Sequence, residues 1–416
     1  MGHPLFITGI DIGSSVIRAV AGTDGLRQGD AFSIVGVSEV PSAGITKGSV
    51  VGIDEAVSAL SSCLEGLERM LGAPVESAYA GIANATINAI PTKGVIAVSR
   101  PDGEIREEDV DRVIEAAQAV ATPPNSEILH VIPRSFTVDQ QAGIRDPIGM
   151  NGIRLEVEAK IIQGMSSQVR NVTKAVFRTG IDIDDLVFSV LAAAEATLST
   201  RQKELGVAIV DIGASLTKLA LFEEGDLLAT AMIPVGGNHI TSDIAIGLRT
   251  SLETAEKIKL EYGNCNADEV TKRDELELSD LSSQERGKVP LRHVVEIIEA
   301  RVEEIFELID KELARAGKSG MLPAGIIVVG GCAKLPGIIE VAKRVCRLPA
   351  SIGYPMNVAS SIERAQDPSF AVAAGLVAWG RTLSVSRNGK GLRSFKINSL
   401  KGIPGAVGKW LRSLIP

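Results

Sequence analysis

The residues best suited to chemistry lie in two short segments that are two hundred positions apart. Residues 9–21 read GIDIGSSVIRAVA and residues 209–221 read IVDIGASLTKLAL, so an Asp-Ile-Gly-x-Ser motif occurs twice. The glycine after each predicted strand lets backbone N–H groups approach a phosphate, and the serine hydroxyls add donors. An aspartate at the strand end can hold a hydrated Mg²⁺ that bridges phosphates. One such turn occurs in many hairpins, but two equivalent copies predict a pair that clamps a phosphate chain.

A third element follows in the second half of the chain. Residues 326–337 read IIVVGGCAKLPG, which predicts a buried strand, a turn with paired glycines and a helix that begins near Ile338. Glycines at this turn let an adenosine lie flat against the backbone. In this order and spacing, the three elements predict a nucleotide site.

The elements that must position these residues form two halves of similar size. Each copy of the motif predicts a β-hairpin followed by a further apolar strand, which indicates a duplicated α/β domain with a cleft between the copies. The first half carries extra strand-like runs and one helix within residues 84–165, enough for a small inserted α+β subdomain. We expect further helices at 166–178, 192–205, 240–262 and 291–316, and a solvated polar stretch at 268–288.

Composition narrows the class of protein. The 416 residues are 45% hydrophobic and 3% aromatic, which suits two or more α/β domains with Ala, Val, Ile and Leu cores. No signal peptide or spanning apolar run is visible. The four cysteines form no CxxC pair and are predicted to be buried free thiols in a reducing cytoplasm: Cys63, Cys265, Cys332 and Cys346.

The C-terminal segment has its own charge pattern. The net charge is −8, yet residues 382–416 contain seven basic residues and no acidic one. Residues 384–400 read as a flexible basic linker, and 401–416 as an amphipathic helix that binds an anionic membrane surface. A core-facing helix is the alternative. The residues predicted to meet the membrane are Ile403, Val407, Lys409, Trp410, Leu411, Arg412, Leu414 and Ile415.

In its two Asp-Ile-Gly motifs and its paired-glycine motif, the chain resembles the FtsA family of bacterial cell-division proteins, within the superfamily of actin, chaperone ATPases and sugar kinases. The resemblance also covers ILHVIPRSFTVD (128–139), GIRDPIGMNGIRLE (143–156), VGGNHITSDIA (235–245) and ETAEKIKLEYG (253–263). It implies an actin-like (ribonuclease H-like) duplicated fold, with two lobes around a nucleotide cleft. The implied subdomains are IA (1–83, 166–198 and 360–383), IC, the insertion (84–165), IIA (199–237 and 318–359) and IIB (238–317).

The resemblance also implies a role for individual residues, with ATP and Mg²⁺ as ligands. The first phosphate loop would comprise Asp11, Gly13, Ser14 and Ser15. The second would comprise Asp211, Gly213, Ser215 and Thr217. Near the ribose and phosphates would lie Gly236, Gly237 and Asn238. The nucleoside would contact Gly330, Gly331 and Ala333, flanked by Glu256 and Lys259. Magnesium would be held through water by Asp11 and Asp211.

Two departures from the superfamily pattern concern hydrolysis. The second loop reads DIGASLTK and lacks the Gly-Gly often found there, and Ser189 stands where the chaperone ATPases place an acidic residue. A positioned general base is therefore not expected. We expect a weak ATPase at most, in which ATP acts mainly as an assembly ligand.

The function implied by the resemblance is that of a cytoskeletal adaptor. It would polymerise with itself on the cytoplasmic side of the inner membrane at the division site, tether the FtsZ ring through the FtsZ C-terminal tail, and link it to later divisome proteins, without nucleic acid. Arg292 and Arg301 are candidates for docking the acidic tail, although solvated helix residues explain them equally well. The alternatives are a pilus-assembly actin homologue, which needs no terminal membrane helix, and a sugar or acid kinase, which needs a catalytic aspartate.

Overall fold

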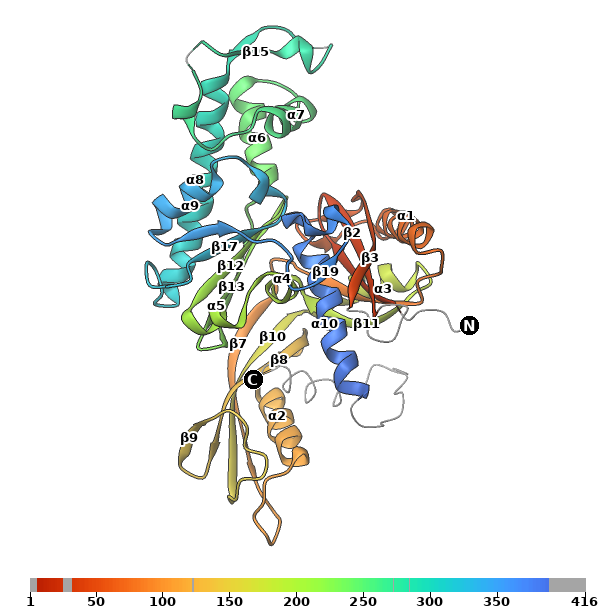
Figure 1. The fold of residues 1–416 in the computed structure, drawn as a ribbon, viewed down its shortest axis with the longest axis vertical. Coiled ribbons are helices and arrows are strands. Elements are labelled where there is room, and N and C mark those ends of the chain that lie inside the picture. Colours follow the sequence, from red (N-terminus) through yellow and green to blue (C-terminus); the bar gives the residue numbers. More distant parts are fainter. Residues whose placement is uncertain (1–5, 25–31, 122, 272, 284, 389–416) are drawn as a thin grey trace.

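The computed structural model describes residues 6–24, 32–121, 123–271, 273–283 and 285–388. Within them, two sheet-based lobes lie side by side, a helical unit extends one lobe at the top of Figure 1, and an inserted unit hangs below. The predicted helix at 401–416, with all its membrane-facing residues, lies outside the described residues.

The first lobe is built on a six-stranded sheet with the strand order β11-β6-β1-β2-β3-β19. β1 pairs antiparallel with β2 and parallel with β6, and β2 continues antiparallel to β3. A small hairpin of β4 (Ile45–Thr46) and β5 (Ser49–Val50) follows β3. The strands are β1 (Ile7–Ile12), β2 (Val16–Thr23), β3 (Ser33–Pro41), β6 (Ser77–Ile82), β11 (Asp182–Phe188) and β19 (Ala359–Ser360).

The second lobe repeats this plan in a five-stranded sheet of order β14-β13-β12-β17-β18. Its strands are β12 (Val207–Ile212), β13 (Thr217–Glu223), β14 (Asp226–Ile233), β17 (Ile326–Val329) and β18 (Ala350–Ile352). The duplication extends to the register of the hairpins, because Asp11 pairs with Arg18 and Asp211 pairs with Lys218. The predicted duplicated α/β fold is therefore confirmed.

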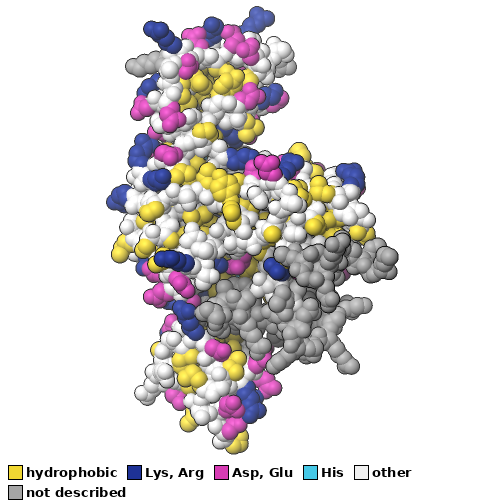
Figure 2. All heavy atoms as spheres, viewed as in Figure 1, with side chains coloured by type: hydrophobic (Ala, Val, Ile, Leu, Met, Phe, Trp, Pro, Cys, Tyr) yellow, Lys and Arg dark blue, Asp and Glu magenta, His cyan; other side chains and the backbone are white. Residues whose placement is uncertain are grey.

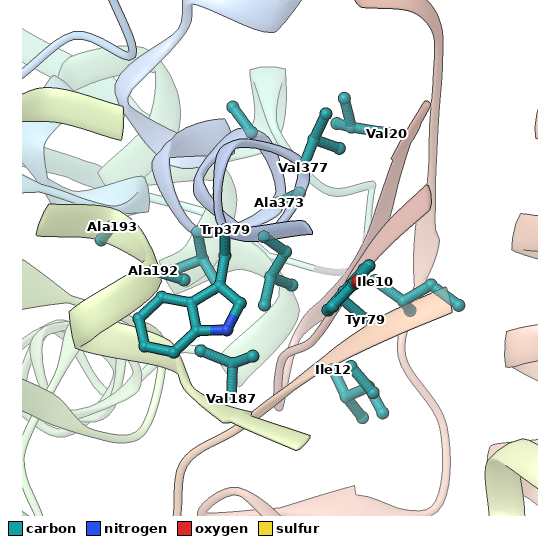
Figure 3. Close-up of a cluster of buried hydrophobic side chains, with 14 of the residues drawn as sticks. Ile10, Ile12, Val20, Tyr79, Val187, Ala192, Ala193, Ala373, Val377 and Trp379 are labelled. Atoms are coloured by element: carbon teal, nitrogen blue, oxygen red, sulfur yellow. The ribbon is translucent and has the colours of Figure 1, made fainter. Parts of the chain in front are cut away.

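Helices cover the first sheet and connect the lobes. They are α1 (Ile53–Leu71), α3 (Ser166–Phe177), α4 (Ser189–Thr197), α5 (Thr200–Leu205) and α10 (Ala371–Asn388). α10 packs on α4 and β1, and Figure 3 shows Trp379 of α10 beside Ala192 of α4 and Val187 of β11. Almost every residue of α4 is buried, so this helix lies between elements of the core. α10 runs five residues into the predicted linker 384–400.

The inserted unit lies between β6 and α3 in the chain. Its sheet has the order β7-β10-β8-β9, with every pair antiparallel, and has its own apolar core beneath α2 (Glu107–Ala121). The strands are β7 (Asn88–Ala97), β8 (Ser126–Val138), β9 (Gln141–Ile144) and β10 (Arg154–Met165). The unit touches the second lobe where Arg145 Nη2 donates to the carbonyl of Glu224 at 2.9 Å.

The upper part of the second lobe is mainly helical. It comprises α6 (Gly237–Leu248), α7 (Leu252–Tyr262) and α8 (Leu291–Arg315), with a hairpin of β15 (Glu275–Glu277) and β16 (Lys288–Pro290). α9 (Ile338–Cys346) follows the paired-glycine turn and packs on α8. In Figure 2, basic and acidic side chains intermingle over this end and over the inserted unit. Within the described part of the chain, no helix combines the length and apolar character needed to cross a membrane.

Three expected segments differ in detail. The helix expected at 240–262 is two helices, because Arg249 adopts a left-handed conformation and Ser251 caps a new helix by accepting from the Thr254 N–H. The helix expected at 192–205 likewise breaks into α4 and α5, where Ser199 and Gln202 form a capping box. The polar stretch at 268–288 is only partly solvated, since Leu276 and Leu278 enter the core.

Candidate functional site

A cleft of about 620 Å³ lies between the two lobes and brings the repeated motifs together. Both hairpin turns, the N-terminus of α6, one face of α7 and the paired-glycine turn line it. The lining includes most of the residues predicted to bind nucleotide: Asp11, Gly13, Ser14, Ser15, Asp211, Gly213, Ser215, Gly237, Asn238, Glu256, Lys259, Gly330 and Gly331.

The other three predicted residues support the cleft from behind. Thr217 is fully buried and its hydroxyl donates to the carbonyl of Val235 at 2.8 Å. Gly236 packs so closely on the second turn that an added Cβ would lie 2.5 Å from the carbonyl oxygen of Gly213. Ala333 is fully buried below the paired-glycine turn. These residues therefore shape the cleft without lining it.

The first hairpin turn presents a serine to solvent. Ser14 Oγ accepts a hydrogen bond from the backbone N–H of Gly48 at 2.9 Å, which ties the turn to the β4–β5 hairpin. Ser15 is exposed in the cleft. Gly13 has no room for a side chain, because a Cβ would lie 2.4 Å from the carbonyl oxygen of Val16. The turn can therefore bring its backbone close to a ligand and offer the Ser15 hydroxyl.

The second hairpin turn is bonded to the start of α6. The N–H groups of Gly237 and Asn238 donate to the carbonyls of Gly213 and Ala214 at 2.9 and 2.7 Å, and Asn238 Nδ2 donates to Ser215 Oγ at 3.3 Å. These two N–H groups are used within the chain, so the N-terminus of α6, which lines the cleft, favours an anion through its dipole and not through these donors. DIGASLTK therefore forms an ordered turn without the Gly-Gly of the superfamily pattern.

The carboxylates of Asp11 and Asp211 and the ammonium of Lys218 line the cleft. Lys218 Nζ lies 2.5 Å from Asp211 Oδ2, and both side chains are largely buried. Burial raises the pKa of Asp11, an effect that the nearby Lys218 opposes. Burial alone would lower the pKa of Lys218, but the carboxylates of Asp211 and Asp11 outweigh it and the pKa is raised. Lys218 is therefore a charged ammonium that is paired with Asp211 and interacts electrostatically with Asp11.

The paired-glycine turn approaches the same aspartate. Gly330 has φ 91° and ψ 178°, a region open essentially to glycine alone, and a Cβ there would lie 2.4 Å from Asp211 Oδ1. Gly331 next to it has open space where a side chain would point. The turn thus needs its first glycine for the backbone, and its second leaves a flat surface in the cleft.

Glu256 and Lys259 occupy one face of α7 at the other end of the cleft. Lys259 Nζ donates to Glu256 Oε2 at 2.6 Å, to Thr241 Oγ1 at 2.8 Å and to the carbonyl of Gly237 at 3.3 Å. Lys259 is 8% exposed, whereas the Glu256 side chain is 41% exposed. Lys259 therefore joins α6 to α7, while Glu256 remains open to a ligand.

The predicted magnesium ligands fit unequally. Asp211 lines the cleft, but its Oδ2 is bonded to Lys218, which leaves Oδ1 for contact with a metal through water. Asp11 lines the cleft and fits contact through water. In the described ranges, no group of three or more His, Cys, Asp or Glu side chains is placed to hold a metal ion.

Ser189 is buried, and the two arginines predicted to dock the FtsZ tail are both in ion pairs. Ser189 begins α4 and is 1% exposed beneath Gly81. Arg301 forms a two-pronged ion pair with Asp243 of α6, with Nη2 to Oδ1 at 2.9 Å. Arg292 pairs with Asp268 and Glu296 at the surface of α8. Both arginines therefore already have carboxylate partners within the chain.

Sequence reasoning missed several side chains of the cleft. Besides Lys218, these are Arg18, Glu39, Leu260, Cys332 and Lys334. The sequence does point to Arg18 and Lys218, because each follows the aspartate of its own copy of the repeat by seven positions. With a tight hairpin turn, that spacing places the two side chains opposite each other on neighbouring strands.

Comparison with known proteins identifies relatives over nearly the whole chain. Two family models match, "Cell division protein FtsA" at residues 208–375 and "SHS2 domain inserted in FTSA" at 84–163. "Cell division protein FtsA" of Bacillus subtilis is 40% identical, over 88% of this chain and 82% of the relative. The protein of the same name from Pseudomonas aeruginosa is 33% identical over 90% and 89%, and that of Escherichia coli K12 is 30% identical over 98% and 96%.

Solved structures of other proteins share the fold. A PilM–PilN type IV pilus biogenesis complex matches with a TM-score of 0.66 at 18% identity, over 91% of this chain and 99% of the other. MreB5 of Spiroplasma citri bound to AMPPNP matches with a TM-score of 0.53 at 15% identity, over 92% and 99%. At these identities the likeness establishes the actin-like, two-lobed fold and nothing further.

Proposed function

The chain belongs to the FtsA family of bacterial cell-division proteins, and on that premise we propose that it binds ATP in the cleft, polymerises on the cytoplasmic membrane and tethers the FtsZ ring there. The protein is an actin-like cell-division protein.

The observation that supports ATP most strongly is the meeting of the two hairpin turns in one cleft. The phosphates would lie between Ser15 of the first turn and Ser215 of the second, near the N-terminus of α6. The adenosine would lie along Gly331, with Glu256 in reach of the ribose. A magnesium ion that enters with ATP would meet Asp11 through water, and when bound it would add charge compensation to the phosphates.

ATP would serve mainly as an assembly ligand. Because the cleft lies between the lobes, a bound nucleotide that contacts both turns would favour one arrangement of the lobes over others. Turnover would be slow, since Ser189 is a buried hydroxyl where an acidic side chain would act in the chaperone ATPases. The domain boundaries predicted for IA, IC, IIA and IIB belong to this proposal.

Membrane attachment would come from residues 401–416. The described chain leaves the first lobe along α10, which ends at Asn388, and the basic linker and amphipathic segment follow. A short helix of this kind binds reversibly as a single copy, and a filament that presents many copies would bind more strongly. This arrangement would place the protein at the division site as a peripheral membrane protein.

The FtsZ tail would dock on the upper part of the second lobe. Arg292 is the more accessible of the two candidates, because its partners Asp268 and Glu296 are exposed and an acidic peptide can replace them. Arg301 is bound to Asp243 between two helices, so it would take part only by giving up a contact that holds α8 to α6. The inserted unit would contact later divisome proteins.

Co-sedimentation with anionic liposomes tests this proposal. The full-length chain and a chain ending at Leu400 are compared, each with and without ATP and with and without FtsZ. We expect the full chain to sediment, ATP to increase the amount and FtsZ to sediment only with the full chain. Sedimentation of the truncated chain to the same extent would overturn the membrane proposal, and failure of FtsZ to follow the full chain would overturn the tether.

A further inference from the structure

The inserted unit is joined covalently to the first lobe alone, yet it also contacts the second. The chain enters it after β6 and leaves it into α3, both of which belong to the first lobe. Its Arg145 Nη2 donates to the carbonyl of Glu224 at 2.9 Å, and its Arg134 Nε lies 3.9 Å from Asp226 Oδ2. β7 and β8 also lie beside β14 (Figure 1). The two arginine interactions form a bridging contact between the lobes.

The turn that receives the two arginines is held from both sides. Glu224 and Gly225 have φ of 55° and 84°, as a tight two-residue turn requires. The N–H groups of these two residues donate to the carbonyls of Glu204 and Lys203 in α5 at 3.0 and 3.1 Å. The carbonyl of Glu224 accepts instead from Arg145. The turn between β13 and β14 is therefore fixed to α5 by its N–H groups and to the inserted unit by its carbonyl.

β13 connects this turn to the nucleotide cleft. It begins at Thr217, beside the second hairpin turn, and ends at Glu223, beside the bridging contact. At about 3.3 Å per residue, the two ends lie roughly 20 Å apart. β13 pairs with β12 on one side and with β14 on the other, so the three strands move as a unit. A contact at the far end of β13 therefore bears on the position of the second hairpin turn relative to the first lobe.

The strength of the bridging contact suits a reversible role. The side chains of Arg134 and Asp226 are 49% and 33% exposed, so water competes for their charges. Burial raises the pKa of Asp226, an effect that Arg145 and Arg134 both oppose. Both guanidinium groups therefore act on this carboxylate, and each makes a modest contribution that can be lost and regained.

The arrangement of the lobes that contains the bridging contact also fits a nucleotide. In it both hairpin turns line one cleft of about 620 Å³, within the usual volume of small-molecule sites. If part of the population leaves this arrangement, the apparent affinity falls in proportion to the fraction of molecules that retain it.

We propose that Arg145, supported by Arg134, is a positioning residue of the nucleotide cleft: it holds the inserted unit on the β13–β14 turn and so maintains the arrangement of the lobes that binds nucleotide. This inference rests on the proposed nucleotide site and adds its regulation. Because coupling between two sites is reciprocal, a nucleotide in the cleft stabilises the bridging contact. A partner that draws the inserted unit away from the turn lowers the nucleotide affinity.

The test measures equilibrium binding of AMPPNP with Mg²⁺ to full-length variants. Arg145→Met should weaken binding about threefold to tenfold, as expected for loss of a partly solvated hydrogen bond from a charged donor. Arg134→Met/Arg145→Met should weaken it further, and Arg145→Lys, which keeps a donor, should restore part of the affinity. The matched control is Arg154→Met, which removes an ion pair with Glu156 of 3.0 Å within the inserted unit and should bind like the wild type.

A second readout separates positioning from a merely structural role. Asp146→Cys and Glu224→Cys place thiols on the two sides of the bridging contact, and the four native thiols are buried. In a chain that also carries Arg145→Met, saturating AMPPNP should raise the rate of cross-linking by a short bismaleimide about threefold to tenfold, because the nucleotide restores the contact. Lys93→Cys/Glu158→Cys, on paired strands within the inserted unit, should cross-link at the same rate with and without AMPPNP.

The failures of the two proposals are distinguishable. Equal affinities of the wild type and Arg134→Met/Arg145→Met, or a rate of cross-linking between positions 146 and 224 that AMPPNP does not change, overturn the positioning role and leave the nucleotide site intact. A loss of affinity in Arg154→Met as large as that in Arg145→Met overturns it as well. Absence of AMPPNP binding by the wild-type chain overturns the proposed nucleotide site itself.

Discussion

Replacement of Gly330 by alanine tests how the paired-glycine turn is built. Gly330 has φ 91° and ψ 178°, where an alanine is strained by about 1–3 kcal/mol. Its Cβ would also lie 2.4 Å from Asp211 Oδ1 and 2.7 Å from the carbonyl oxygen of Ile212. Because one of these contacts is backbone, relief requires movement of β12, which costs about 1–3 kcal/mol more. We expect Gly330→Ala to lower the free energy of unfolding by roughly 2–6 kcal/mol.

The neighbouring glycine provides the control. A Cβ on Gly331 meets no atom within 4 Å and its φ is not in the left-handed region, so Gly331→Ala should change the stability by less than about 0.5 kcal/mol. Both variants are measured without nucleotide by urea denaturation, with circular dichroism for the backbone and the fluorescence of Trp379 for the tertiary structure. Equal unfolding midpoints for the two variants would refute the close approach of Gly330 to Asp211.

Three other expectations follow from buried groups. Burial lowers the pKa of His130 from 6.5 to about 4, so below pH 6.5 the unfolded chain gains a proton that the folded chain does not. The free energy of unfolding should therefore fall by up to about 3 kcal/mol between pH 6.5 and 4. His130→Gln keeps an acceptor for the backbone and should reduce this pH dependence, as measured by denaturation at a series of pH values. Arg301→Ala should lower the free energy of unfolding by about 1–3 kcal/mol by breaking the pair with Asp243. Arg292→Ala should lower it by less than about 1 kcal/mol, because the partners of Arg292 are exposed; equal urea midpoints would contradict this. All four cysteines are buried free thiols: Cys63, Cys265, Cys332 and Cys346. At pH 8 a thiol reagent should label them slowly in the native chain and fully after unfolding, because burial raises the pKa of each thiol to about 11 or 12. Fast labelling of the native chain would contradict their burial.

The repeat made the central architecture predictable from sequence. Two Asp-Ile-Gly motifs with alternating apolar flanks specify two hairpins, and the structure places both turns in one cleft. The inserted unit was predictable as well, except that β9 was not expected because its sequence, Gln-Ala-Gly-Ile, is short and mostly exposed at a sheet edge. Strands and hairpins with a clear alternation of apolar residues could therefore be predicted from the local sequence alone.

What the sequence did not reveal depends on register and on single backbone conformations. The pairing of Lys218 with Asp211 requires the length of the turn between their strands, which residue types do not specify. The break between α6 and α7 depends on the left-handed conformation of Arg249, a residue type that seldom adopts it. The sequence does not show that Arg301 pairs with Asp243, because the two residues lie on different helices that meet only in the folded chain.

The central claim is that the two hairpin turns hold an adenosine nucleotide between them. The most direct measurement is a crystal structure of the full chain with AMPPNP. The account predicts a phosphate chain between Ser15 and Ser215, with the adenosine against Gly331. Binding of the nucleotide at any other place, or an empty cleft at saturating nucleotide, would contradict it.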